Sequence, residues 1–118
     1  MLPETETPHR VFTYEQARDL LPAVRQITQQ FIARMSVLET PIADDDTGDA
    51  VQERWRDEAA VVLSQWAEKV EELGIVVKGP WLIDFDSGSG YYCWKWPEES
   101  LEFFHGYDEG FASRLRLQ

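Results

Sequence analysis

The sequence predicts an α+β fold in which a long antiparallel helical hairpin packs on a small three-stranded antiparallel β-meander. Up to Gly74, apolar residues recur at spacings of three and four, which is typical of helices that bury one face. Beyond Gly74 they alternate with polar residues, in segments separated by turn-rich connectors. The length of 118 residues fits one domain with one core. We expect a flexible tail over residues 1–10 and a single domain over residues 11–118.

The first helix is predicted over residues 14–39. Thr13, with Gln16 three positions later, has the pattern of a capping box and predicts where the helix begins. A proline costs about 3 kcal/mol inside a helix but is tolerated in a first turn. Pro22 therefore predicts the end of a short helix and the start of a longer one. The longer helix carries an apolar stripe, formed by Val24, Ile27, Phe31, Met35 and Leu38.

The second helix is predicted over residues 51–73, after an acidic connector over residues 41–50. Gly74 follows it as a C-terminal stop. Because a short loop joins the two helices, we expect their apolar stripes to pack together in an antiparallel hairpin. The stripe of the second helix is formed by Val51, Trp55, Ala59, Val62, Trp66, Val70 and Leu73.

Three strands are predicted within residues 75–105, in the segments "WLIDF", "YYCWKW" and "LEFFH". The preceding segment "IVVK" either adds a short strand or only approaches the sheet. If the turns "DSGSG" and "PEES" both close symmetrically, Asp84 faces Tyr92 and Tyr92 faces His105. Cys93 then falls on the opposite face of the sheet among apolar residues, where a thiol is typically buried and inert.

The predicted register brings a carboxylate, a phenol and an imidazole into one row, with steps of roughly 5 Å. With two acids that follow the last strand, they form a candidate binding site of Asp84, Tyr92, His105, Asp108 and Glu109. Such groups act as acid and base, or hold a metal through His105, Glu109 and Asp84. Carboxylates with one imidazole suit manganese, iron or magnesium better than structural zinc. In the structural alternative, Tyr92 and His105 cap a core edge and Asp84 tightens the following turn.

Both faces of the predicted sheet are apolar, and one helical hairpin covers only one side of a small sheet. The second side is then buried by the N-terminal helix, by the C-terminal segment or by another chain. We expect a homodimer, or a complex with another protein, through an aromatic surface that contains Trp94, Trp96 and Phe103.

The composition argues against several classes of partner. The chain has 22 acidic and 11 basic residues and a formal net charge of -11, which disfavours binding to nucleic acid. The single cysteine, Cys93, forms no internal disulfide and no zinc site by itself. No apolar run reaches the roughly 18 residues needed to span a membrane, and the start does not resemble a signal peptide. We expect a cytoplasmic protein that needs no cofactor, unless a divalent metal binds.

Three segments, "FTYEQARDLLPAV", "ELGIVVKGPWLIDF" and "CWKWPEESLEFFHGYDEGFASR", resemble the domain of unknown function 2203 family of small bacterial proteins. The resemblance covers nearly the whole chain and implies one compact bacterial cytoplasmic domain, without implying an activity. Phe104 stands where the family pattern has tryptophan. The positions that match the pattern are Asp84, Phe85, Cys93, Trp94, His105, Gly110, Phe111 and Arg114.

The function predicted first is that of a non-enzymatic interaction module that self-associates. The alternative is a small metal-binding protein or metal-dependent enzyme that uses a carboxylate and histidine site. The sequence leaves both open and identifies no substrate.

Overall fold

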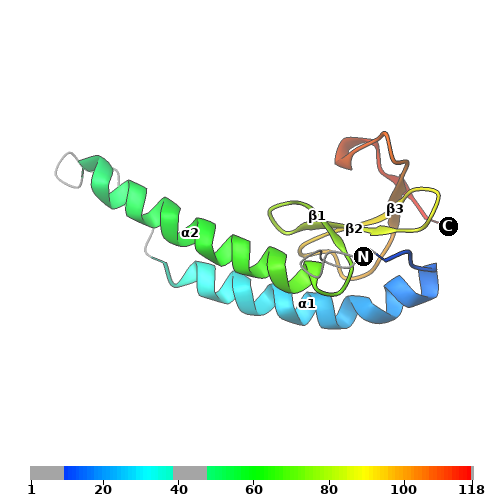
Figure 1. The fold of residues 1–118 in the computed structure, drawn as a ribbon, viewed down its shortest axis with the longest axis horizontal. Coiled ribbons are helices and arrows are strands. Elements are labelled where there is room, and N and C mark those ends of the chain that lie inside the picture. The colour runs from blue at the N-terminus through cyan, green and yellow to red at the C-terminus, as the bar shows by residue number, and fades with distance from the viewer. Residues whose placement is uncertain (1–9, 39–47, 118) are drawn as a thin grey trace, which may run out of the picture.

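A computed structural model describes residues 10–38 and 48–117 of the chain. Two long helices lie side by side, and their far ends extend beyond a small antiparallel sheet (Figure 1). The α+β class and the helical hairpin are therefore confirmed. The predicted tail as far as residue 9, and the predicted connector as far as residue 47, lie outside the described residues.

Helix α1 (Tyr14–Ser36) contains the predicted capping box. The Gln16 N–H donates to Thr13 Oγ1 at 3.1 Å, and the Thr13 N–H donates to Gln16 Oε1 at 2.9 Å. The predicted break at Pro22 was wrong, because this residue lies inside one continuous helix. Pro22 is exposed, so water can reach the carbonyl that loses its helical partner there.

Helix α2 (Gly48–Glu71) begins earlier than predicted and packs against α1. A buried polar contact links the two helices. The Trp66 indole N–H donates to the Thr28 hydroxyl at 2.9 Å, and this hydroxyl donates to the Val24 carbonyl at 2.7 Å. Gly74 follows the helix with a φ of 85°, as expected of a C-terminal stop.

The sheet has five antiparallel strands in the order β1-β2-β3-β4-β5, so the prediction of three strands was wrong. The strands are β1 (Val76–Gly79), β2 (Leu82–Asp86), β3 (Tyr91–Lys95), β4 (Phe103–His105) and β5 (Leu115–Arg116). The two additional strands form the edges of the sheet. Strand β5 follows a short 3₁₀ helix (Phe111–Ser113) and is too short for alternation of apolar residues to reveal it.

The register between β2 and β3 differs by one residue from the symmetric prediction. Asp84 pairs with Cys93 and not with Tyr92. Asp86 accounts for the shift, because it stays in the strand and its carboxylate accepts a hydrogen bond from the Gly88 N–H at 2.8 Å. This contact is typical of an aspartate that begins a turn, and it leaves only residues 87–90 in the loop.

The register between β3 and β4 is also shifted by one residue, since His105 pairs with Tyr91 and not with Tyr92. The predicted "PEES" turn is replaced by a longer connector that Glu98 organises. Its carboxylate accepts from the Lys95 N–H at 2.9 Å, and its carbonyl accepts from the Trp94 indole N–H at 2.8 Å.

The two shifts together decide which side chains share a face. A shift of one residue between two strands moves every side chain of the second strand to the opposite face of the sheet. The shift between β2 and β3 therefore reverses the predicted faces of β3, and the further shift between β3 and β4 returns β4 to its predicted faces. Asp84 and His105 therefore still share a face, as predicted. On β3, which lies between them, Cys93 takes the face that had been predicted for Tyr92.

The two faces of the sheet have different surroundings. One face packs on the helices and contributes Ile83, Phe85 and Trp94 to the core. The other face carries Asp84, Cys93 and His105 under the segment that follows β4. None of the helices in the described part of the chain is both long enough and apolar enough to span a membrane.

Candidate functional site

A cavity of about 240 Å³ lies on the face of the sheet that points away from the helices. Four strands and the segment after β4 supply its lining. The lining residues are Lys78, Leu82, Asp84, Cys93, His105, Glu109, Gly110 and Phe111. The cavity thus collects side chains that are far apart in the sequence.

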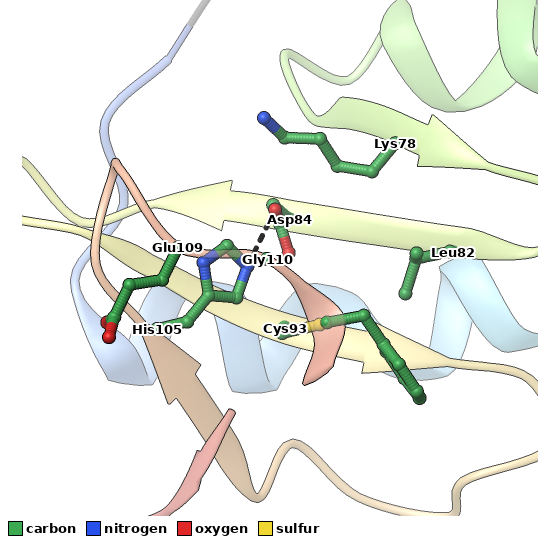
Figure 2. Close-up of a pocket in the computed structure, with 8 residues that line it drawn as sticks. Lys78, Leu82, Asp84, Cys93, His105, Glu109 and Gly110 are labelled. Carbon is green, nitrogen blue, oxygen red and sulfur yellow. Dashed lines mark hydrogen bonds and ion pairs between the residues drawn. The ribbon is translucent and has the colours of Figure 1, made fainter. Parts of the chain in front are cut away.

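Asp84 and His105 form a buried pair in this cavity. His105 Nε2 lies 2.9 Å from Asp84 Oδ2, and their side chains are 3% and 1% exposed. Figure 2 shows the two side chains pointing toward each other. Asp84 lies in β2 and His105 in β4, with β3 between these strands. The structure therefore brings together two of the residues that the sequence placed in the candidate site.

The other nitrogen of His105 is held by the backbone. Nδ1 lies 2.9 Å from the carbonyl oxygen of Gly106, which also accepts the Glu109 N–H at 3.1 Å. A carbonyl oxygen only accepts hydrogen bonds, so Nδ1 carries the proton. The second ring nitrogen, Nε2, faces the Asp84 carboxylate.

Cys93 completes the cluster, and the sequence prediction had missed it. The thiol, the Asp84 carboxylate and the His105 imidazole each offer one ligand atom, and these atoms all lie within 4.8 Å of one another. Burial first, and then the charge of Asp84 and a hydrogen bond with it, raise the pKa of the Cys93 thiol from 9.0 to about 12. Arg114 opposes this shift, with Nη1 4.0 Å from the sulfur.

A protonated, buried thiol is a poor nucleophile, so the predicted inertness of Cys93 agrees with its pKa. Its predicted position was wrong. The sequence signal that could have placed it is Asp86, since an aspartate two residues before Gly88 favours a turn that starts at the aspartate itself.

Asp84 also has an atom without a partner. Its Oδ1 is buried and receives no N–H or O–H donor from the described residues, although a hydrogen bond with the Cys93 thiol reaches this carboxylate. Leaving such an atom unpaired costs about 1–3 kcal/mol, and more when the group is charged. A buried polar atom of this kind calls for an explanation, such as an ordered water, an ion or a catalytic role.

The remaining predicted site residues do not join the cluster of Asp84, Cys93 and His105. Tyr92 is on the helix-facing side of the sheet, where its ring centroid is 5.6 Å from that of Tyr14. Asp108 is exposed. Glu109 borders the cavity, but its carboxylate accepts the Gly106 N–H at 2.8 Å and points away from Asp84 in Figure 2.

The predicted interface residues are divided in the same way. Trp94 is fully buried in the core, so it offers no surface to a partner. Trp96 is partly buried against the core. Phe103 is partly covered by Arg114, whose guanidinium carbon lies 3.9 Å from the ring centroid. A continuous aromatic surface of these three residues is therefore absent from the described part of the chain.

Comparison with known proteins places the chain in a family. The family model described as "Uncharacterized conserved protein (DUF2203)" matches residues 10–117. The match covers most of the chain, which therefore belongs to the DUF2203 family, as the sequence motifs had indicated. No curated protein and no solved structure matches the chain.

Proposed function

We propose that this DUF2203 protein binds a divalent transition metal ion, with Zn²⁺ as the best fit, through Asp84, Cys93 and His105. The observation that carries the proposal is the buried set of three ligand atoms, from three neighbouring strands, within 4.8 Å of one another. Oxygen, sulfur and nitrogen ligands of these types are those that zinc takes in proteins.

The hydrogen bonding of His105 supports this role. Metal-binding histidines commonly donate the second ring N–H to a backbone carbonyl, which fixes the ring and directs the other nitrogen to the metal. His105 has this arrangement, with Nδ1 facing the Gly106 carbonyl and Nε2 facing Asp84. A cation between Nε2 and the carboxylate satisfies both lone pairs at once.

Cys93 decides between metals. The sequence suggested manganese, iron or magnesium, which prefer oxygen-rich sites. A thiolate ligand favours zinc instead. Tetrahedral zinc holds sulfur, nitrogen and oxygen ligands about 3.3–3.6 Å apart. Binding thus requires spacings of up to 4.8 Å between the ligand atoms to shorten by as much as about 1.2–1.5 Å.

Metal analysis of protein purified without chelators or a histidine tag tests the proposal. We expect one zinc ion per chain. Zinc at about 100 times its dissociation constant stabilises a protein by about 2.7 kcal/mol, which corresponds to a rise of roughly 10 °C in the melting temperature. Cys93→Ser should abolish both effects.

Glu109→Gln is the matched control, because this side chain borders the cavity without facing the cluster. It should retain the zinc ion and the thermal shift. Absence of stoichiometric zinc, together with a melting temperature that zinc leaves unchanged, would contradict the proposal. Loss of zinc in Glu109→Gln would instead support the ligand set of His105, Glu109 and Asp84 that the sequence suggested.

Self-association through a second copy of the chain is the second candidate. It is supported by an apolar groove between α2 and β1, of about 360 Å³, whose lining includes Leu63, Ala67 and Val77. Sedimentation equilibrium should then give twice the chain mass of 13.7 kDa. Leu63→Glu should shift the mass toward the monomer. A monomer at all concentrations would eliminate this candidate and leave the metal proposal intact.

A further inference from the structure

Lys78 places a positive charge at the mouth of the cavity. It lies in β1 at the point where the register shifts between Val77 and Gly79, a bulge of the kind that redirects side chains. Its side chain is exposed and extends over the cavity in Figure 2. The ammonium lies 4.5 Å from the centroid of the Tyr91 ring, and no described carboxylate forms an ion pair with it.

The charge of the cavity depends on the metal. In the metal-free protein, the Asp84 carboxylate lies on the cavity floor and repels an incoming anion. A zinc ion balances the charges of Asp84 and a Cys93 thiolate, so Lys78 then supplies the positive charge at the mouth, while the Glu109 carboxylate in the lining points away from the cluster. Arg114 adds little, because Glu98 pairs with it at 2.9 Å. The metal-loaded cavity is therefore suited to anions although the chain has a net charge of -11.

The ligand set leaves room for a further ligand. Three protein ligands with a fourth position for water or substrate are typical of catalytic zinc sites, whereas structural sites have four protein ligands. The other lining residues that carry side chains are Leu82 and Phe111, which are apolar, and Glu109, which is engaged with Gly106. A ligand in the cavity thus meets the metal, one ammonium group and apolar walls.

We propose that the metal-loaded site binds a small monocarboxylate with a short apolar tail. One carboxylate oxygen takes the open position on the metal, the other faces Lys78 Nζ, and the tail lies against Leu82 and Phe111. A phosphate dianion fits less well, because phosphate sites usually supply several charged donors, and Lys78 is the only lysine or arginine among the described residues that line the cavity. This inference rests on the metal proposal and adds the class of ligand.

Cobalt-substituted protein provides the test, since Co²⁺ takes the same ligands as zinc and its visible spectrum reports a change of ligand. Butyrate should change the spectrum in a saturable way, whereas inorganic phosphate should have a weaker effect. Lys78→Gln should raise the butyrate dissociation constant about tenfold, as expected for loss of one charged hydrogen-bond donor. Lys69→Gln, which removes an exposed lysine from α2, should leave it unchanged.

The outcomes separate the two proposals. If Co²⁺ does not bind at the cluster, both proposals fall. If Co²⁺ binds and butyrate leaves the spectrum unchanged, the metal proposal stands and the carboxylate proposal falls. Equal butyrate affinity in Lys78→Gln and wild type, or tighter binding of phosphate than of butyrate, also overturns it. Calorimetry on the metal-free protein should detect no binding, and binding of similar strength there would contradict the role of the metal.

Discussion

The two faces of the sheet bury very different side chains. The helix-facing side holds Ile83, Phe85 and Trp94, all fully buried and apolar. The opposite side holds three of the buried polar or charged side chains of the described residues, Asp84, Asp86 and His105. The fourth, Thr28, lies between the helices and has both a donor and an acceptor as partners.

The helix-facing side of the sheet contributes to the free energy of folding, whereas burial of polar groups on the opposite side opposes it. Apolar burial against the helices stabilises the domain by about 25 cal/mol for each Å² removed from water. Burial of a carboxylate and an imidazole under a short terminal segment opposes folding unless partners are supplied. Local violations of good packing tend to mark functional sites, and the unpaired Asp84 oxygen is one of them. The other buried unpaired atoms of the described residues, Arg25 Nε and Trp55 Nε1, belong to the helices.

Cys93 and Trp94 test this comparison most directly, because they are neighbours on β3 that point to opposite faces. Trp94→Ala should lower the free energy of unfolding of the metal-free protein by about 3–5 kcal/mol, owing to the cavity that it leaves. Cys93→Ala should cost about 1 kcal/mol. Chemical denaturation with and without zinc measures both. Stabilisation by zinc should persist in folded Trp94→Ala and vanish in Cys93→Ala.

The comparison would be contradicted if Trp94→Ala and Cys93→Ala lost equal free energies of unfolding and zinc stabilised both variants. The helix-facing side would then not be the main source of stability, and the opposite side would not be the zinc site.

Thr28→Val removes the polar partner inside the hairpin. The Trp66 indole N–H, which donates to Thr28, is then left buried without an acceptor. The expected loss is about 1–3 kcal/mol. Thermal unfolding monitored by tryptophan fluorescence measures it. The effect should be the same with and without zinc, and a dependence on zinc would show that the two faces are coupled.

Asp84→Asn should have a smaller effect on the metal-free protein. The asparagine side chain can donate an N–H to His105 Nε2, so the 2.9 Å contact is kept as a neutral hydrogen bond. The free energy of unfolding should stay the same or rise by up to about 1 kcal/mol. Zinc affinity should fall, as measured by competition with a chromophoric chelator. A loss of more than about 2 kcal/mol would instead identify the pair as a stabilising ion pair.

Titration of the Cys93 thiol should have the smallest effect on the free energy of unfolding near neutral pH. Its pKa is about 12 in the metal-free fold against 9.0 without the fold, so the native state retains the proton longer than the unfolded state. The resulting contribution to stability is fully present below about pH 9 and is lost as the pH rises toward 12. Thiolate absorbance in the ultraviolet should therefore appear only well above pH 9. A native thiolate at pH 8 would contradict the burial of this side chain.

The helices were predictable because their signals are local. The capping box of Thr13 and Gln16, the periodic apolar stripes and Gly74 all act within a few residues. Pro22 misled the prediction, since its cost in a helix depends on whether the unpaired carbonyl is accessible to water. Only the packed structure shows that this side of α1 is exposed.

The candidate site was predicted in part. Asp84 and His105 were placed on one face because the two register errors cancelled between β2 and β4. Cys93 was missed, and Tyr92 was included in its place, because the single shift on β3 did not cancel. The position of Lys78 over the cavity depends on a bulge in β1. The prediction used no sequence signal for this bulge.

By itself, the sequence determined the family, the α+β class, the helical hairpin and the presence of strands between Ile75 and His105. These features follow from periodicity and capping, which neighbouring residues specify. The tertiary structure decided the strand register, the two edge strands and the residues that line the cavity. A register depends on hydrogen bonds in the connectors, such as those of Asp86 and Glu98, and a shift of one residue exchanges the faces of a strand.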